Sequence, residues 1–458
     1  MADRAVTMEK LVALCKARGI IFPGSEIYGG MGNTWDYGPV GVEIKNNIKR
    51  AWWKRFVSES DNSYGVDAAI LMNSRVWEAS GHTTSFSDPK MDCKKCKTRH
   101  RADNLIEAYS KGAVNPDTMS NEEMEKYIEE HHINCPNCGN FDWTNIRTFN
   151  LMFETSRGVT DESQNKIYLR PETAQGEFVN FLNVQRTARA KVPFGIAQVG
   201  KAFRNEITPG NFIFRTIEFE QMEHQWFCKE GTDEAFYNEY KEKAMSFLVD
   251  LGFDKEHLRF HDHDKLAHYA RAACDIQYLY PMGWQELNGI HNRTDYDLSR
   301  HQEFSGKTLT YVDPMNGERY IPYVIEYSIG ADRLMLAVLS EAYDEEKLEN
   351  GEVRNVMHFH PAIAAYKAAI LPLQKNLAPK AKEFLVRLKK LFSVTYDEAG
   401  SIGKRYRRQD EIGTPYCITV DFDTLEDGTM TVRDRDTMEQ QRLTAEQIIA
   451  FLTEKCAF

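Results

Sequence analysis

The feature that most constrains the fold is a pair of neighbouring segments with strand patterning. Residues 194–207, FGIAQVGKAFRNEI, show strand-like alternation, and TPGN at 208–211 is typical of a turn. Residues 209–227, PGNFIFRTIEFEQMEHQWF, begin within that turn and then continue without another Gly or Pro. Two such segments joined by a short turn predict a long antiparallel hairpin.

The charged residues of this hairpin fall on shared faces. Side chains alternate between the two faces of a strand, so Arg215, Phe219 and Glu223 share a face, and Arg204 and Glu206 share one on the preceding strand. A closed hairpin can bring these faces together. Arginine suits phosphate oxygens, an aromatic ring suits a purine, and a carboxylate suits an amine. The spacing alone is also compatible with an amphipathic hairpin whose charged face is solvated.

A second segment carries related chemistry. Residues 320–343, YIPYVIEYSIGADRLMLAVLSEAY, predict a strand that enters a helix near Gly330. Glu326 and Ser328 share a strand face, and Gly330 permits close backbone approach where the N-terminus of the helix favours anions. Arg333, at the start of that helix, can stack on a base or hold a phosphate.

Length and charge set the broad class. A chain of 458 residues predicts two or three domains, and a net charge of −11 argues against general coating of nucleic acid while allowing a local basic patch. No segment approaches the ~20 apolar residues of a membrane helix, so we expect a cytoplasmic protein that does not act at a membrane. After residues 358–362, HFHPA, strand and helix patterns alternate, which predicts a separate small α/β domain.

Four of the nine cysteines form two CxxC pairs, CKKC and CPNC, which flank an acidic, helical insertion. Four thiolates suit a tetrahedral Zn²⁺ ion, and four protein ligands leave no open coordination position. A zinc ion bound by Cys93, Cys96, Cys135 and Cys138 would therefore be structural. Free surface thiols are the alternative.

Several stretches resemble the motifs of class II aminoacyl-tRNA synthetases: the Pro39 region, FRNE (203–206), RTIEFEQME (215–223) and SIGADR (328–333). Within that class, a further set resembles the homodimeric glycyl-tRNA synthetases: WDYGPVG (35–41), LRPETAQG (169–176), ELNGI (286–290) and GSIGKRYRRQDEIGTPY (400–416). The resemblance extends from about residue 18 to the end of the chain.

The resemblance implies a fold and an architecture. The fold class is α+β, with an antiparallel sheet flanked by helices. Residues 1–361 would form the catalytic domain, with the CxxC insertion at about 90–145, and residues 362–458 would form an α/β anticodon-binding domain. A homodimer is implied as well.

The resemblance also implies an activity. Such an enzyme activates glycine with ATP to glycyl-adenylate and pyrophosphate, and then transfers glycine to the 3′ end of tRNA(Gly). This chemistry depends on positioning and charge neutralisation more than on a protein nucleophile. Its cofactors are ATP and Mg²⁺, its partners are tRNA(Gly), glycine and a second copy of the chain, and a structural Zn²⁺ is the further metal.

Family roles carry over to matching positions of this sequence. Arg204, Glu206 and Arg333 are the catalytic residues: Arg204 holds the α-phosphate and the carboxylate, Glu206 orients the adenine side, and Arg333 covers one face of adenine. Phe219 stacks under its other face, and Arg215 reaches the γ-phosphate.

The implied binding residues form two sets. The ATP set is Arg204, Asn205, Glu206, Phe214, Arg215, Thr216, Ile217, Glu218, Phe219, Glu286, Leu287, Gly330, Ala331, Asp332 and Arg333, with Glu286 as a candidate Mg²⁺ ligand. The glycine set is Arg101, Glu172, Phe219, Glu220, Gln221, Met222, Glu223, Arg293, Glu326, Ser328 and Gly330. The acids among them suit the ammonium group of glycine.

The densest basic cluster of this acidic chain lies near its C-terminus, at Lys404, Arg405, Arg407 and Arg408, with Tyr406 interleaved. A charge run is usually a solvated face. Because the domain resembles an anticodon-binding domain, we expect these four cations to bind tRNA, with an aromatic available for base stacking.

One position departs from the family pattern, which has Pro where this chain has Tyr327, between Glu326 and Ser328. Tyr327 points to the opposite strand face and is expected to pack elsewhere. Because glycine has no smaller competitor, we expect no editing domain. The alternatives are a class II synthetase for threonine, proline or histidine, a non-catalytic accessory relative, and an ATP-dependent ligase with a small-molecule acceptor.

Overall fold

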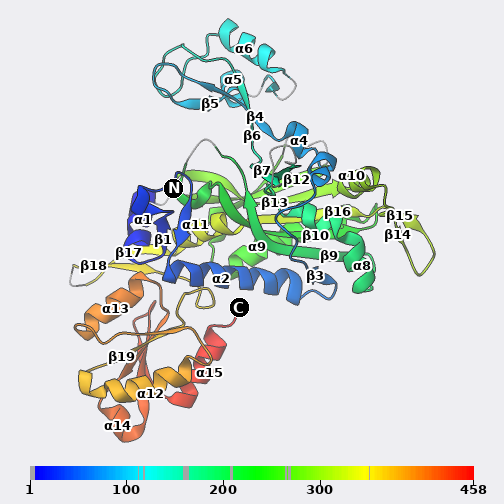
Figure 1. Cartoon of the computed structure of the whole chain (residues 1–458). Coiled ribbons are helices and arrows are strands. Elements are labelled where there is room, and N and C mark those ends of the chain that lie inside the picture. The colour runs from blue at the N-terminus through cyan, green and yellow to red at the C-terminus, as the bar shows by residue number, and fades with distance from the viewer. Residues whose placement is uncertain are drawn as a thin grey trace.

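The structure is a computed structural model that describes residues 6–111, 113–116, 119–157, 165–206, 210–263, 266, 270–349 and 351–458. Figure 1 shows a central body built on a large sheet, an insertion that projects from it, and a C-terminal part on the opposite side. Across these residues, no helix combines the length and the apolar character needed to cross a membrane.

The central body is built on a seven-stranded sheet with the order β11-β12-β13-β16-β10-β9-β3. Every neighbouring pair is antiparallel except β3 with β9, which confirms the implied antiparallel sheet. The strands are β3 (Ser63–Gly65), β9 (Phe194–Phe203), β10 (Glu218–Cys228), β11 (Leu258–Asp262), β12 (Ala272–Tyr280), β13 (Gly283–Thr294) and β16 (Tyr323–Gly330).

Alternation along the strands gives the sheet two different faces. On one face, Met222 and Ile329 are buried in the main core, and on the other, Phe227 and Val324 are buried in a second core. Helices packed in the main core are α1 (Met8–Ala17), α2 (Pro39–Trp53), α9 (Asp233–Asp250) and α11 (Ala331–Ala342). Those of the second core are α7 (Ala174–Val179), α8 (Phe181–Thr187) and α10 (Tyr296–Ser305).

The predicted hairpin is present, but its strands are shorter than the pattern indicated. Arg204, Glu206 and Arg215 lie in the connection between β9 and β10, outside both strands. The strand predicted after the 208–211 turn is wrong at its start, because Phe212–Phe214 form a 3-10 turn. The three apolar side chains of this turn are all buried in the main core. The first half of the predicted TPGN turn lies outside the described residues.

The passage from strand to helix near Gly330 is confirmed, since β16 ends at this residue and α11 follows directly. Tyr327 is buried on the sheet face opposite Glu326, as expected from alternation. Its ring centroid lies 4.5 Å from that of Phe56 and 6.5 Å from that of Trp52. The Tyr327 side chain, which departs from the family pattern, therefore packs in the main core.

The insertion has a small core of its own, which includes Ile106, Met124 and Ile128. It contains a three-stranded sheet of order β5-β4-β6 and two helices, and it projects from the body at the top of Figure 1. These elements are β4 (Ser87–Asp92), β5 (Arg99–Arg101), α5 (Ala102–Ser110), α6 (Asn121–Glu130) and β6 (Arg147–Asn150).

The C-terminal part has a five-stranded sheet of order β20-β19-β21-β22-β23. β19 is parallel to β20 and β21, and the remaining pairs are antiparallel, so this sheet is mixed. A core separate from that of the body includes Ile370, Phe384, Ile418 and Leu452. The elements are β19 (Ala368–Pro372), α12 (Ala378–Leu388), β20 (Val394–Tyr396), α13 (Ile402–Glu411), β21 (Tyr416–Val420), α14 (Asp423–Asp427), β22 (Thr429–Asp434), β23 (Gln440–Thr444) and α15 (Ala445–Lys455).

A buried arginine joins the body to the C-terminal part. Arg354 lies on β18 (Val353–Met357), pairs with Glu346 at 2.8 Å and donates to the backbone oxygen of Arg435 at 3.0 Å. Its Nη1 is 3.5 Å from Asp410 of α13.

The remaining α-helices and strands are β1 (Ile21–Pro23), β2 (Trp35–Tyr37), α3 (Ser74–Ala79), α4 (His82–Ser85), β7 (Glu154–Arg157), β8 (Asn165–Tyr168), β14 (Tyr311–Val312), β15 (Arg319–Tyr320) and β17 (Tyr343–Lys347).

Candidate active site

A cavity of about 550 Å³ lies on the sheet face that carries Glu223 and Glu326. β10, β13 and β16 supply its floor, and the β9–β10 connection, the start of α11 and the start of the insertion supply its walls. The predicted site residues that line it are Arg101, Glu172, Arg204, Glu206, Phe214, Arg215, Thr216, Phe219, Gln221, Glu223, Glu286, Leu287, Arg293, Glu326, Ser328, Gly330, Asp332 and Arg333.

Six predicted residues do not line the cavity: Asn205, Ile217, Glu218, Glu220, Met222 and Ala331. Met222 is fully buried in the main core, on the face of β10 opposite Glu223. Glu220 points the same way as Met222 and pairs with Lys45 at 2.9 Å and Lys49 at 3.0 Å. Alternation along β10 therefore removes these two from the glycine set.

One corner of the cavity is acidic. Glu223 on β10 faces Ser328 on the neighbouring β16, and the Ser328 hydroxyl donates to Oε1 of Glu223 at 2.8 Å. The Thr173 hydroxyl donates to the other oxygen of Glu223. Glu172 completes the corner and accepts from the side-chain amide of Gln175 at 2.9 Å. Carboxylates that converge in this way suit a small cation such as an ammonium group.

Glu326, two residues before Ser328 on β16, is the third carboxylate and has the strongest partners. Arg293 Nη1 lies 3.2 Å from it, His291 Nδ1 lies 2.9 Å from it, and the Gln225 amide donates to it at 2.9 Å. Asp297 holds the same arginine through contacts of 2.7 and 3.0 Å. Glu326 is thus fixed in place as an ionised group.

The two central carboxylates differ in protonation. Burial, followed by the charges of Glu326 and Glu172, raises the pKa of Glu223 to about 7. Burial also opposes ionisation of Glu326, but Arg293 and then His291 outweigh it and lower its pKa to about 2. The acidic corner therefore holds one carboxylate that is always ionised and one that titrates near neutral pH.

The other end of the cavity combines arginines with aromatic rings. The guanidinium carbon of Arg204 lies 5.4 Å from the ring centroid of Phe219, and that of Arg333 lies 4.5 Å from the ring centroid of Phe214. Arg333 also pairs with Glu286 at 3.0 Å. Cationic forks beside flat rings suit a phosphorylated purine.

A buried cluster behind this end supports Arg333. Asp332, its neighbour in the first turn of α11, accepts from Lys45 of α2 at 2.7 Å and from the hydroxyl of Tyr37. Its second oxygen accepts from the backbone N–H of Glu220 at 2.8 Å. Three distant segments therefore fix where α11 begins.

Among the residues at the site, sequence reasoning missed Phe86, Asp88 and His291, which line the cavity, and His82, whose Nε2 lies 3.4 Å from Glu172. His291 could have been found, because it lies on the same face of β13 as the predicted Arg293. The other three lie in a stretch whose sequence shows no clear strand or helix period. Their position depends on the path of the chain into the insertion, where Asp88 pairs with Arg101 at 3.0 Å.

Comparison with known proteins decides the family. A family model for the tRNA synthetase class II core domain (G, H, P, S and T) matches residues 153–342, and one for the anticodon-binding domain matches residues 367–455. A glycine–tRNA ligase of Clostridium perfringens is 62% identical over 462 residues, which cover 99% of each chain. The chain belongs to the glycine–tRNA ligase family. Another member, from Geobacillus thermodenitrificans, is 60% identical over 461 residues, covering 100% of this chain and 99% of that one.

A solved structure agrees with this fold at low sequence identity. It is described as the RNA-binding domain of threonyl-tRNA synthetase from Cryptosporidium parvum Iowa II, and it matches with a TM-score of 0.65 and 15% identity. The match covers 97% of this member of the glycine–tRNA ligase family and 98% of the other chain. At this identity the match supports the overall fold alone.

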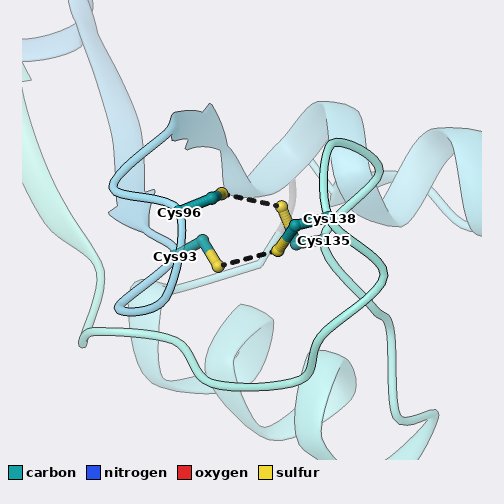
Figure 2. A group of neighbouring side chains, drawn as sticks. All are labelled: Cys93, Cys96, Cys135 and Cys138. Atoms are coloured by element: carbon teal, nitrogen blue, oxygen red, sulfur yellow. Dashed lines mark hydrogen bonds between the residues drawn. The ribbon is translucent and has the colours of Figure 1, made fainter.

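The four cysteines predicted to bind zinc come together in the insertion, as Figure 2 shows. The sulfur of Cys93 lies 3.6 Å from that of Cys138, and the sulfur of Cys96 lies 3.7 Å from that of Cys135. A zinc ion with Zn–S bonds of about 2.3 Å and tetrahedral geometry requires sulfur–sulfur distances of about 3.8 Å. The donor set and its spacing therefore fit Zn²⁺.

The basic cluster near the C-terminus corrects one prediction. Arg405 on α13 is buried, with 3% of its surface exposed, and donates to the backbone oxygens of Pro372 at 2.6 Å and Leu373 at 3.4 Å. It supports the fold of this part and is not available to tRNA. The buried residues of α13 are the polar Arg405, Gln409 and Asp410, which a charge count could not show.

The other three cations of the cluster differ in how they are held. Lys404 is exposed. Arg407 pairs with Glu352 of the central body at 3.1 Å, and Arg408 pairs with Asp397 through Nε at 2.9 Å. Lys404 and Arg407 are therefore the members of the cluster that can reach a partner with least rearrangement.

Proposed function

We propose that this chain is a glycine–tRNA ligase that activates glycine with ATP and then transfers it to the 3′ end of tRNA(Gly). One observation carries the proposal. Three carboxylates, the buried Glu223 and Glu326 and the half-buried Glu172, converge in the same cavity as the arginine and aromatic pairs that suit a nucleotide. A chain of this family needs both halves in one cavity, because its two substrates react with each other.

The first step is attack of an oxygen of the glycine carboxylate on the α-phosphorus of ATP. The phosphorus–oxygen bond to the β-phosphate breaks, and pyrophosphate leaves with the bonding electrons. Glu223 and Glu326 hold the ammonium group, and Arg204 neutralises the α-phosphate and orients the carboxylate. Phe219 and Arg333 hold the adenine, Glu206 orients it, and no side chain forms a covalent bond.

Mg²⁺ bound to the phosphates of ATP would lower the charge that builds on the departing pyrophosphate. Glu286 fits such an ion, because its side chain is half exposed at the cavity and offers hard oxygen ligands. In the structure the same carboxylate pairs with Arg333 at 3.0 Å. Glu286 therefore has two uses, to hold Arg333 in place and to bind the metal with the nucleotide.

The second step transfers the glycyl group. A hydroxyl of the terminal ribose of tRNA attacks the carbonyl carbon of the adenylate, and AMP leaves. Selectivity for glycine comes from size, since any larger amino acid must place its side chain in a corner walled by Glu223, Ser328 and Thr173. No smaller amino acid competes, so the enzyme needs no editing domain.

The remaining features of the proposal concern organisation. Residues 1–361 would be the catalytic domain and residues 362–458 the anticodon-binding domain, in which Lys404 and Arg407 contact tRNA. We propose a homodimer, as the family resemblance implied, and a location in the cytoplasm. The four cysteines would hold a structural Zn²⁺ that stabilises the insertion, and their closed set of ligands leaves the ion no catalytic position.

The test is amino-acid-dependent exchange of labelled pyrophosphate into ATP, with glycine, alanine, serine, threonine and proline measured in parallel. Exchange with glycine alone supports the proposal. Exchange with another amino acid would show that the enzyme activates that amino acid. No exchange by folded protein with Mg²⁺ present would favour a non-catalytic relative.

A further inference from the structure

A buried polar cluster beneath the acidic corner takes no part in the chemistry described above. Glu177 lies on α7, Gln198 on β9 and Gln225 on β10, and none of the three has any exposed surface. α7 packs on both strands at this point. Gln198 and Gln225 lie on the same sheet face as Glu223, so the cluster continues the polar floor of the cavity inward.

Four polar atoms of this cluster are unpaired within the described part of the chain. They are both carboxylate oxygens of Glu177, Nε2 of Gln198 and Oε1 of Gln225. The other half of each amide is engaged, since Gln198 Oε1 accepts from the backbone N–H of Ala68 at 2.8 Å and Gln225 Nε2 donates to Glu326 at 2.9 Å. Buried polar atoms are rarely left without partners in native proteins.

The charges around Glu177 disfavour its ionised form. Burial, and then repulsion from Glu223 and Glu326, raise the pKa of Glu177 well above its ordinary value. The charge of Arg170 opposes this rise, and its guanidinium donates to the backbone oxygens of Ala68 and Lys201. The backbone N–H of Gln225 is near enough to oppose the rise as well, but does not meet hydrogen-bond geometry.

A protonated carboxyl group matches what the two amides lack. It offers one O–H donor and one carbonyl acceptor, while the cluster presents one unpaired acceptor on Gln225 and one unpaired donor on Gln198. A buried water with two to four polar partners is common in such places and could bridge them.

We propose that Glu177 is a positioning residue that acts as a neutral carboxylic acid, donating to Oε1 of Gln225 directly or through a buried water. This hydrogen bond fixes the Gln225 amide so that Nε2 faces Glu326. The reversed amide would place an oxygen against the Glu326 carboxylate and repel it. Glu177 thereby keeps Glu326 aligned for the ammonium group of glycine, a role that rests on the proposed function.

Two variants of nearly the same size test this role by pyrophosphate exchange. Glu177→Gln keeps one donor and one acceptor without a charge, so we expect its KM for glycine to stay within about twofold of wild type. Glu177→Leu removes the donor, and we expect KM for glycine to rise about three- to tenfold, the effect of one neutral hydrogen bond, with KM for ATP and kcat little changed. Phe181→Leu, in the adjacent apolar core, is the control for general loosening and should leave KM for glycine unchanged.

The outcomes separate the alternatives. A large rise in KM for Glu177→Gln would overturn the proposal, because it would show that an ionised carboxylate assists ammonium binding. An unchanged KM for Glu177→Leu would overturn it as well, leaving a packing role only. The proposal is supported if KM for glycine rises in Glu177→Leu and stays near the wild-type value in Glu177→Gln.

A second readout does not depend on activity. A protonated carboxyl group gives a carbonyl stretching band in the infrared spectrum, and we expect the difference between wild type and Glu177→Gln to contain one. Its absence overturns the neutral state of Glu177. If the wild type exchanges no pyrophosphate with glycine but the band is present, the proposed function fails while the protonated cluster stands.

Discussion

The titration of Glu223 makes a quantitative prediction about glycine binding. With a pKa of about 7 in the folded protein, Glu223 is mostly neutral below that pH and holds the ammonium group only when ionised. Two units below its pKa, roughly one molecule in a hundred is ionised, so kcat/KM for glycine should fall about tenfold per pH unit on the acid side of 7 and level off above it. Glu326, with a pKa of about 2, contributes nothing to this limb.

The assay is pyrophosphate exchange at saturating ATP across the range from about pH 5.5 to about pH 9. We expect Glu223→Gln to lower the plateau of kcat/KM for glycine at high pH and to abolish the fall of kcat/KM at acid pH. Because ATP itself can titrate in this range, the same variant serves as the control: a limb that belongs to ATP persists in it. A flat wild-type profile, or an acid limb that survives the substitution, would refute the reasoning.

The titration of Glu223 also predicts how stability depends on pH. Its contribution to the free energy of unfolding decreases as the pH rises, whereas kcat/KM for glycine increases. The pKa of Glu223 is raised on folding, from ~4.3 to about 7, so its contribution to the free energy of unfolding is complete below ~4.3 and is lost as the pH rises through about 7. The difference corresponds to at most about 4 kcal/mol. Urea unfolding should therefore show Glu223→Gln gaining stability relative to wild type between about pH 5 and about pH 8. No relative gain would indicate that Glu223 is ionised throughout.

Three further predictions concern other parts of the chain. Arg293→Lys loses the paired contacts with Asp297, and KM for glycine should rise about tenfold in the exchange assay; an unchanged KM would contradict the geometry. Cys96→Ser should lower bound zinc and destabilise the insertion, and metal analysis showing well below one Zn per wild-type chain would remove the zinc proposal altogether. The double variant Lys404→Ala, Arg407→Ala should weaken tRNA charging while sparing exchange, whereas equal loss in both steps would argue against a tRNA contact.

Much of the site could be predicted because its residues follow strand alternation. Glu223 and Phe219 share a face of β10, and Glu326 and Ser328 share a face of β16, as the two-residue period requires. The same period placed Tyr327 on the opposite face. Family resemblance added Glu172, in the segment before α7, and Arg293 on β13, which no local pattern connects to these strands.

The errors arose where local patterns conflict with packing. Arg215 was assigned to a strand, but the buried run Phe212–Phe214 turns the chain before β10 begins. Arg405 was counted with the exposed cations, yet its guanidinium satisfies backbone oxygens inside the C-terminal part. In each case a contact distant in sequence outweighed the local pattern.

The sequence by itself determined which chemical groups this protein brings to its candidate sites: the acids, arginines and aromatic rings of the cavity and the four cysteines of the insertion. It also determined the strand faces, which follow from a period of two. Only the tertiary structure decided which of them meet. Asp332 and Lys45 are 287 positions apart in sequence and 2.7 Å apart in space, and the raised pKa of Glu223 depends on Glu172 and Glu326 from two other segments. Burial and Coulomb interaction depend on distance in space, which the order of residues along the chain does not contain.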